Sequence, residues 1–308
     1  MDKRFAIILL LLPLLASCVT RQDPKVFEND EGHYRSYYAL DGLESAFKGT
    51  LIEGDIPLWT WSSTPADYEL TVLFIHGYLD HSALTAPLIQ FLDGKSCRII
   101  AFDLPGHGRS GGKRASLEDF EEYREALERV MVYWDLTYEE TLFIGHSTGG
   151  ALILDRLVEG ADMKGAVLAA PLVQFRWYRL SSTLLSIFAK GEVPVSRRRS
   201  SHNREFNRMK VHDPLFIKRM PLNWPLAIMD WYEGLPSGAI DYDGPVLILQ
   251  GEKDHVVYYE KNVPRVMEWY PHADVHYYSQ FMHHILNEKE TSRLYADLGR
   301  WLDQSFFS

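Results

Sequence analysis

The feature of this chain that most constrains its fold is a series of six short apolar segments, which alternate with helical patterns between residues 71 and 279. Most of these segments are continuous apolar runs, which is typical of strands that are buried on both faces. Strands that alternate with helices favour a mostly parallel sheet flanked by helices. The predicted strands are residues 71–77, 97–103, 141–146, 165–170, 246–251 and 275–279. The sequence therefore predicts an α/β fold.

Three segments between and after these strands predict helices. Residues 116–119, which read SLED, resemble a capping box and predict the start of a long helix that ends near Trp134. A second helix is expected over residues 149–158. Residues 287–306 carry a stripe of apolar side chains at helical spacing, and this pattern predicts an amphipathic helix at the end of the chain.

Two aromatic-rich segments precede the first of these strands. They read YRSYYAL at residues 34–40 and PLWTWSS at residues 57–63. Aromatic and β-branched residues are enriched in strands. We therefore expect these two segments to form an antiparallel hairpin region at one edge of the sheet.

A long interval separates the fourth predicted strand from the fifth, and a simple crossover would need far fewer residues. The interval is rich in Trp, Tyr and Phe and holds more basic than acidic side chains, although the whole chain has a net charge of −10. We interpret it as an inserted, mainly helical cap over the carboxyl ends of the strands, where ligands bind in open α/β folds. The predicted divisions are a signal peptide over 1–17, a tether over 18–32, a core over 33–173 and 245–308, and the cap over 174–244.

The N-terminus reads MDKRFAIILLLLPLLASC. Two basic residues precede an apolar run that is too short for a confident membrane-spanning helix, and small residues follow it. This arrangement is that of a secretory signal peptide. An ordinary signal peptide that is cleaved nearby would explain most of the pattern.

The end of this segment, Leu15-Ala-Ser-Cys18, also resembles the bacterial lipobox. The resemblance implies cleavage before Cys18, which would become the lipid-carrying N-terminus and anchor the protein to a membrane. Val19 follows, whereas a signal for retention in the inner membrane would usually place Asp there. We therefore expect a lipid-anchored protein of the cell envelope, in the outer membrane.

Composition and motif content argue against several other classes. The acidic net charge disfavours nucleic acid as a partner. Two cysteines, Cys18 and Cys97, cannot form a disulfide framework. The histidines show no metal-ligand spacing, and the glycine-rich GHGRSGG, residues 106–112, lacks the G-K-[ST] ending of a phosphate loop. We expect neither a metal nor a cofactor, and the sequence does not indicate an oligomeric state.

The strongest chemical motif is GHSTGG at residues 145–150, which fits the pattern G-x-S-x-G. A predicted strand precedes it and a predicted helix follows, which is the context of the nucleophile turn in α/β-hydrolases. Glycines two positions before and after Ser147 allow the tight turn that exposes the serine above the sheet. A free serine is a poor nucleophile, so the interpretation requires a base and an acid elsewhere in the chain.

Both partners are present, in the order nucleophile, acid and histidine that this fold uses. Asp254 lies just after the predicted strand 246–251, and His283 and His284 lie just after the last one. The candidate triad is Ser147, Asp254 and one of these two histidines. The oxyanion would be held by the backbone N–H groups of Thr148, which follows the nucleophile, and of Tyr78.

Three polar residues near these motifs favour a structural interpretation. His76 ends the strand before Tyr78, and we expect it to fix that loop by hydrogen bonds. Asp103 and His107 lie in the turn FDLPGHGRS and are expected to stabilise loops.

Six motifs together resemble the monoacylglycerol lipase and lysophospholipase group of serine α/β-hydrolases. They are HGYLDHS, FDLPGHGRSGGKR, LEDFEEY, GHSTGG, GEKDHVV and HHILNE, and the resemblance covers about residues 45–305. The group usually has Met at the position of Thr148 and Glu at that of His284, and it has Gly-Glu where this chain has Leu79-Asp80. Its late motif, H-E-x-x-N-E, implies that His283 is the base, with His284 as the alternative.

The resemblance implies a serine esterase that cleaves the single acyl ester of a lysophospholipid or a monoacylglycerol. A general carboxylesterase for short or non-lipid esters stays open, as does a related amide or peptide hydrolase, because a triad alone does not separate these reactions. A binding protein on an inactive hydrolase scaffold is a further alternative, which the intact candidate triad disfavours.

A basic run, SRRRSSHNR, occupies residues 196–204 within the predicted cap. Such a run is often only a solvated loop or helix end. In the cap of a lipid-anchored esterase, Arg197, Arg198 and Arg199 could instead form a cationic rim that faces the phosphate of a lipid headgroup.

Overall fold

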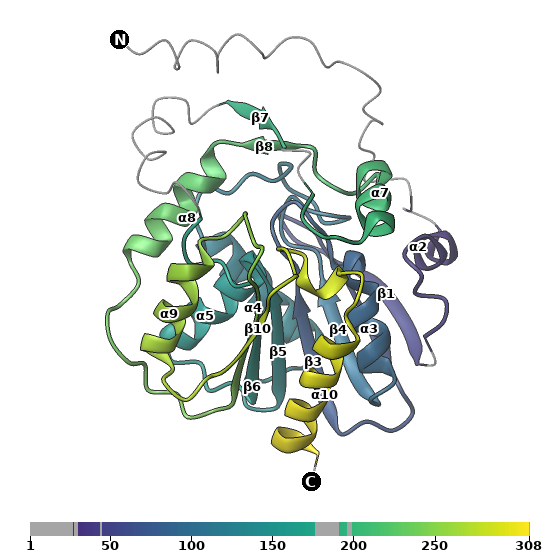
Figure 1. Ribbon diagram of the computed structural model, residues 1–308. Helices are drawn as coiled ribbons and strands as arrows, with labels where there is room; N and C mark the ends of the chain where they lie inside the picture. Colours follow the sequence, from purple (N-terminus) through teal and green to yellow (C-terminus); the bar gives the residue numbers. More distant parts are fainter. Residues whose placement is uncertain (1–26, 28–29, 44, 176–190, 196–198, 308) are drawn as a thin grey trace.

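The computed structural model describes residues 27, 30–43, 45–175, 191–195 and 199–307. Its centre is an eight-stranded sheet with the strand order β1-β2-β4-β3-β5-β6-β9-β10 (Figure 1). The strands are β1 (Ala46–Ile52), β2 (Leu58–Thr64), β3 (Leu70–Ile75), β4 (Cys97–Phe102), β5 (Thr141–His146), β6 (Gly165–Ala169), β9 (Val246–Gly251) and β10 (Asp274–Tyr278).

The six strands from β4 to β10 along this order pair in parallel, and β1 and β2 join them in antiparallel fashion at one edge. Each of the six predicted strands corresponds to one of these parallel strands, with ends that agree closely. The predicted α/β-hydrolase fold class is confirmed. A parallel sheet aligns the carboxyl ends of its strands along one edge, and the loops that follow β3, β5, β9 and β10 therefore meet there.

Helices cover both faces of the sheet because its strands are apolar on both faces. On β3, Leu73 and Ile75 pack into one core cluster, whereas Val72 and Phe74 pack into the other, as the alternation of a strand requires. The first cluster is covered by α4 (Glu121–Trp134), α5 (Thr148–Val158) and α9 (Tyr259–Trp269), and the second by α3 (Ala86–Asp93) and α10 (Ser292–Phe306) (Figure 1).

The prediction of a strand at residues 34–40 is wrong, because residues 31–37 form the helix α2 (Glu31–Tyr37). The Asp30 carboxylate accepts a hydrogen bond from the His33 backbone N–H at 2.8 Å and caps the helix. Tyr34 and Tyr38 lie one helical turn apart and are both buried. The aromatic residues therefore pack as a helix stripe, and the hairpin at the sheet edge consists of β1 and β2 instead.

Two helices begin later than the sequence predicts. The helix predicted from residue 116 is α4, and it begins at Glu121. The Glu122 carboxylate accepts hydrogen bonds from the backbone N–H groups of Glu118 and Asp119, so the capping acid lies inside this helix. The helix predicted from residue 287 is α10, which begins at Ser292 after a short 3-10 turn at Ile285–Asn287.

The chain between β6 and β9 contains β7 (Glu192–Pro194), α7 (Arg204–His212), β8 (Arg219–Pro221) and α8 (Asn223–Glu233), which Figure 1 shows beyond the carboxyl ends of the strands. We call residues 199–244 the described cap. It packs on the loops at this end of the sheet. The Ile217 N–H donates to the Leu79 carbonyl at 3.1 Å, and Arg114 donates to the Leu215 carbonyl at 3.0 Å. The predicted boundaries of the cap stay predictions.

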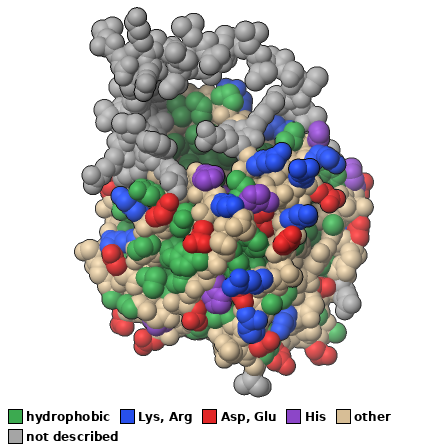
Figure 2. Space-filling view, viewed as in Figure 1, with side chains coloured by type: hydrophobic (Ala, Val, Ile, Leu, Met, Phe, Trp, Pro, Cys, Tyr) green, Lys and Arg blue, Asp and Glu red, His purple; other side chains and the backbone are tan. Residues whose placement is uncertain are grey.

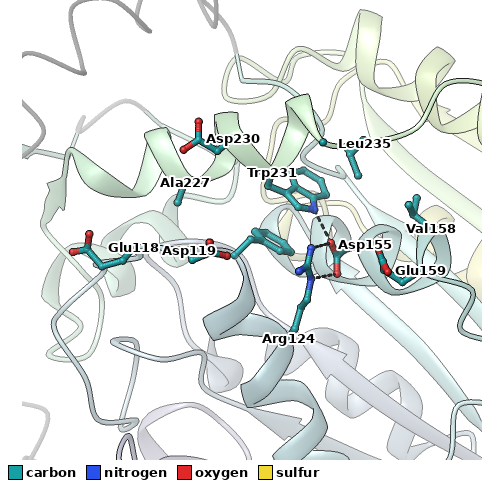
Figure 3. A pocket seen from close by; sticks show the side chains of 12 residues that line it. Glu118, Asp119, Arg124, Asp155, Val158, Glu159, Ala227, Asp230, Trp231 and Leu235 are labelled. Carbon is teal, nitrogen blue, oxygen red and sulfur yellow. Dashed lines mark hydrogen bonds and ion pairs between the residues drawn. The ribbon is translucent and has the colours of Figure 1, made fainter.

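The helix α8 is also attached to the side of the core, away from these loops. The indole N–H of Trp231 donates to the Asp155 carboxylate at 2.8 Å, and Arg124 holds the same carboxylate through two nitrogens, each at 2.8 Å (Figure 3). Phe120 stacks on Trp231 with ring centroids 4.7 Å apart. The cavity in Figure 3 lies between α4, α5 and α8, near the C-terminal end of α5.

The predicted signal peptide and Cys18 lie outside the residues that the structure describes, as does most of the predicted tether. Across the described ranges, none of the helices combines the length and the apolar character that crossing a membrane demands.

Candidate active site

Ser147 occupies the turn between β5 and α5. Its backbone has φ 51° and ψ −109°, a conformation that a residue with a side chain adopts only under strain. The glycines on either side of Ser147 are required because a Cβ atom there would collide with neighbouring backbone. A Cβ on Gly145 would lie 2.5 Å from the backbone of Gly149, and a Cβ on Gly149 would lie 2.1 Å from the carbonyl oxygen of Ile75. The predicted nucleophile turn is therefore formed in the folded chain.

Asp254 and His283 lie after β9 and β10 and form a hydrogen bond of 2.8 Å between Oδ2 and Nδ1. The other carboxylate oxygen accepts from the backbone N–H groups of Val256 and Val257, at 2.8 and 3.1 Å. Burial alone would raise the pKa of Asp254, but His283 and these N–H donors outweigh it and hold the pKa below its ordinary value. An ionised Asp254 fixes the proton of His283 on Nδ1 and leaves Nε2 as the acceptor nitrogen.

His146 links the serine turn to the histidine loop. Its Nε2–H donates to the carbonyl oxygen of His283 at 3.0 Å, and the two rings lie 4.9 Å apart between centroids. Burial and the neighbouring His283 and His284 lower the pKa of His146 to about 3, so its ring is neutral at physiological pH. Because Ser147 directly follows His146, this bond holds the backbone of His283 close to the candidate nucleophile. The sequence analysis missed this role, and the only local signal is the position before the serine.

The two predicted oxyanion donors flank the same turn. Thr148 is the first residue of α5, where backbone N–H groups have no partner inside the helix and carry the positive end of its dipole. A Cβ on Gly77 would lie 3.2 Å from the Ser147 Cβ, so the loop that continues to Tyr78 passes directly against the serine. The Tyr78 ring stacks on Trp224 of α8 at 3.7 Å, and its hydroxyl donates to the Ala115 carbonyl at 2.8 Å.

His76, Asp103 and His107, which the sequence analysis assigns to loop stabilisation, all make buried loop contacts. His107 Nδ1 lies 2.8 Å from the Pro105 carbonyl oxygen. His76 Nε2 accepts from the Leu104 N–H at 2.9 Å. The Asp103 carboxylate accepts from the N–H groups of Ser82 and Arg109, each at 2.8 Å. These bonds fix the loops after β3 and β4, as the sequence suggests.

His284 forms a second aspartate–histidine pair beside the first. Its Nε2 lies 2.9 Å from Asp80 Oδ2 and 3.4 Å from the Lys210 Nζ. Burial and Lys210 lower the pKa of His284 to about 4. Because Asp80 already occupies Nε2 of His284, whereas Asp254 leaves Nε2 of His283 available, the geometry favours His283 over His284 as the base.

Two further predictions concern charged side chains. In the described ranges, no three His, Cys, Asp or Glu side chains are grouped so that they could hold a metal ion. Of the basic run, Arg197 and Arg198 lie outside the described residues, and Arg199 is exposed. The cationic rim therefore stays a prediction.

The surface above the sheet is hollowed on the face that Figure 2 shows. The visible wall of the hollow carries hydrophobic side chains, and histidine side chains lie just below it (Figure 2). A hydrophobic wall beside polar groups is typical of a site that binds a largely apolar ligand.

Comparisons with known proteins agree with this geometry. Residues 66–290 match the family described as serine aminopeptidase, S33. The chain is 27% identical to a monoacylglycerol lipase of Mycolicibacterium smegmatis, over 80% of this chain and 91% of that protein. It is 23% identical to phospholipase YtpA of Bacillus subtilis, over 80% of this chain and 99% of that protein.

A solved structure gives the same fold. The monoacylglycerol lipase of Paleococcus ferrophilus aligns with a TM-score of 0.69 and 21% identity, over 80% of this chain and 99% of the other. At this identity the likeness concerns the arrangement of strands and helices.

Proposed function

The chain belongs to the family of α/β hydrolases described as serine aminopeptidase, S33, and on this premise we propose that it is a serine esterase that cleaves the acyl ester of a single-chain lipid, a monoacylglycerol or a lysophospholipid. The reaction type is inferred from one observation. The strained Ser147 turn lies next to the Asp254–His283 pair, and the hydrogen bond from His146 to the His283 carbonyl holds the two together. The names of the relatives, a monoacylglycerol lipase and a phospholipase, support the substrate class.

The first half of the reaction forms an acyl-enzyme. His283 Nε2 takes the proton of Ser147 as the serine oxygen attacks the ester carbonyl carbon. Asp254 keeps the other ring proton on Nδ1 and stabilises the imidazolium that forms. The negative charge that develops on the carbonyl oxygen is held by the N–H groups of Tyr78 and Thr148. His283 then gives its proton to the alcohol oxygen of the ester, and the glycerol-containing alcohol leaves.

The second half regenerates the enzyme. A water molecule gives a proton to His283, and its oxygen attacks the acyl carbon. The bond from this carbon to Ser147 breaks, the serine recovers a proton from His283, and the fatty acid departs. All charges that develop are held by side chains and amides of this chain.

Aromatic residues of the described cap favour a lipid substrate over a polar one. Trp224 lies directly over the Tyr78 ring, beside the proposed oxyanion donor. Trp224 belongs to the core cluster that includes Leu172 and Val173, and Tyr78 packs against that cluster. The hydrophobic wall in Figure 2 fits the same interpretation. An acyl chain would bury apolar surface there, at about 0.8 kcal/mol for each buried CH₂.

The proposal is tested by a substrate panel with wild-type protein and Ser147→Ala. Purified protein without residues 1–17 is assayed on monoacylglycerols, lysophospholipids, p-nitrophenyl acetate and an aminoacyl p-nitroanilide. We expect the highest kcat/KM on a long-chain single-acyl lipid and complete loss of turnover in Ser147→Ala. Turnover that persists in this variant, with its thermal unfolding unchanged, would contradict the mechanism.

The panel also separates the alternatives. Preference for acetate or butyrate esters would leave a general carboxylesterase. Preference for the anilide would match the aminopeptidase in the family description instead. A fluorophosphonate probe that labels wild-type protein but not Ser147→Ala excludes a binding protein on an inactive scaffold.

We also propose that Cys18 carries the lipid that anchors this enzyme to the bacterial outer membrane, which the lipobox-like Leu15-Ala-Ser-Cys18 supports. Metabolic labelling with an alkyne fatty acid, followed by membrane fractionation, tests the anchor. We expect label in wild-type protein and none in Cys18→Ala. A soluble, unlabelled wild-type protein would favour an ordinary cleaved signal peptide.

The basic run belongs to the same proposal. Arg197, Arg198 and Arg199 would attract anionic lipid headgroups. Reversal of all three to Glu is expected to lower kcat/KM on anionic lysophospholipids while leaving monoacylglycerol turnover unchanged. An equal loss on both substrates would remove the rim from the proposal.

A further inference from the structure

A buried cluster of charged side chains lies directly behind the proposed base, and the reaction scheme above does not use it. It consists of Asp80, which follows the loop of Tyr78, His284, which follows His283, and Lys210 of α7. Asp80 and His284 are buried and Lys210 is partly buried, and His284 Nε2 lies 2.9 Å from Asp80 Oδ2 and 3.4 Å from Lys210 Nζ. Isolated ions are costly to bury, so such a group needs internal compensation.

The amino group of the partly buried Lys210 has polar and aromatic neighbours. Its Nζ donates to Ser200 Oγ at 3.0 Å and lies 4.7 Å from the centre of the Phe216 ring. Burial lowers the pKa of Lys210, while the negative charges of Asp80 and Asp213 oppose this effect. In its protonated form, Lys210 places a positive charge beside the Asp80–His284 pair.

At neutral pH the carboxylate of Asp80 is charged and the ring of His284 is not. Burial would raise the pKa of Asp80, but His284 and Lys210 outweigh it and hold the pKa far below its ordinary value, so Asp80 is an anion. His284 has its pKa lowered to about 4 by burial and by Lys210, and its ring is neutral. The buried carboxylate of Asp80 and the partly buried Nζ of Lys210 therefore both lie beside Nε2 of a neutral imidazole.

The cluster connects the three segments on which the proposed reaction depends. Asp80 continues the loop that carries the Tyr78 donor, and its Oδ2 also lies 3.9 Å from His146 Nδ1. The His284 N–H donates to the Ser200 carbonyl at 2.8 Å, which fixes the base loop to the described cap. The ring of His284 lies 5.6 Å from that of His283 between centroids.

We propose that Asp80, His284 and Lys210 are positioning residues that hold His283 in place and, through the balance of their two charges, set the pH at which it acts as a base. This inference rests on the proposed role of His283. The titratable groups that face His283 are Asp254 from the loop after β9, His146 from β5 and His284 on its own loop. Asp80 and Lys210 both lie beside the His284 ring, and an ionised carboxylate and a protonated amine there have charges of opposite sign.

The sequence carries a matching signal. Asp80 and His284 are two of the positions at which this chain departs from the glutamates usual in the group that it resembles. The structure places these two departures in contact with each other. Lys210, from the described cap, is the third member of the cluster.

A double-mutant cycle tests the charge balance. Asp80→Asn leaves the lysine cation unopposed, which disfavours imidazolium at His283 and lowers its pKa. Lys210→Met leaves the aspartate anion unopposed and raises it, because Met keeps the packing of the stem but removes the charge. We expect shifts of about 0.5–1 pH unit in opposite directions, and a return close to the wild-type pKa in the double variant.

Two readouts keep the test independent of the proposed function. The pKa of His283 is measured by NMR titration of ¹⁵N-labelled histidine side chains, assigned with His283→Gln, and needs no turnover. The acid limb of kcat/KM on an ester substrate should move by the same amounts as the titration. If the wild-type protein hydrolyses no ester while the titration shows the opposite shifts, the charge cluster stands and the esterase proposal fails.

A matched control pair lies at the other end of the sheet. Lys95 and Asp303 form an ion pair of 2.6 Å with both side chains partly exposed, and Lys95 precedes β4 at the amino ends of the strands. Lys95→Met and Asp303→Asn are expected to leave the titration of His283 unchanged. The inference is overturned if folded Asp80→Asn and Lys210→Met variants, checked by circular dichroism, shift the pKa in the same direction or by less than about 0.2 unit.

Discussion

Two neighbouring histidines of one loop each contact a buried aspartate, and the two pairs differ in which ring nitrogen the aspartate holds. Asp254 binds Nδ1 of His283, whereas Asp80 binds Nε2 of His284. The first arrangement leaves Nε2 of the ring to act on a substrate. The second occupies Nε2 and connects the loop after β3 to the loop after β10. The same two residue types therefore form the proposed catalytic pair in one place and a structural connection in the other.

The surroundings of the two carboxylates explain the difference. Asp254 also accepts two backbone N–H groups in its own loop, so its orientation is set locally. Asp80 has Lys210 of the described cap nearby, and it depends on a segment far away in the chain. A pair whose geometry depends on a distant segment suits the attachment of that segment, and a pair that is fixed locally suits precise proton transfer.

The largest effect that separates the two pairs is expected from replacing each histidine with glutamine. His283→Gln should lower kcat/KM by at least about 10³-fold, since it removes the proton acceptor. His284→Gln should lower it by about 10-fold, because the base stays but loses its support. Ester hydrolysis and thermal unfolding of both variants provide the measurement. Equal losses would show that the two histidines act as one unit.

The next largest effect concerns Asp254. Asp254→Asn keeps the shape of the side chain but no longer stabilises imidazolium, so we expect kcat to fall by about 10³- to 10⁴-fold. The isosteric Asp80→Asn, measured beside it in the same assay, should leave at least a tenth of the activity at its own pH optimum. A larger loss in Asp80→Asn than in Asp254→Asn would reverse the assignment of the two carboxylates.

A smaller effect is expected on stability in mild acid. The pKa of His284 is about 4 in the folded protein and about 6.5 in an unfolded chain. Between these values the unfolded chain binds more protons, so the free energy of unfolding falls as the pH drops from about 6.5 to 4. The slope of the free energy of unfolding against pH reports how many more protons the unfolded chain binds. His284→Gln should reduce this number by up to one, measured by urea unfolding at several pH values. The same change at exposed His272 serves as the control, and an unchanged slope in His284→Gln would contradict the buried neutral imidazole.

The smallest effect is expected where α8 meets the side of the core. Trp231→Phe keeps the stack with Phe120 but removes the hydrogen bond to Asp155, which should cost about 1 kcal/mol of stability. For a chain of this size we expect the melting temperature to fall by about 2–4 °C, with kcat/KM and its pH profile unchanged. A shifted pH profile would show that this attachment, like that of α7, influences the base.

Much of the fold could be predicted because its signals are local. The apolar runs that became β3, β4, β5, β6, β9 and β10 are each recognisable within a few residues, and the glycines around Ser147 report a tight turn in the same way. At residues 34–40, in contrast, the local signal was not sufficient. Its spacing suits a helix or a strand, and only the burial of Tyr34 and Tyr38 against the core decided for a helix.

By itself, the sequence determined the order of the strands along the chain and placed Ser147, Asp254 and His283 each just beyond a strand end. Only the tertiary structure decided which nitrogen of each histidine is held, that His146 supports His283 across 137 positions of the chain, and that Asp80 meets His284 across 204. The physical reason is that contacts between distant segments depend on how the whole sheet and the described cap pack. The charged side chains on these segments interact strongly only after burial has removed the water between them.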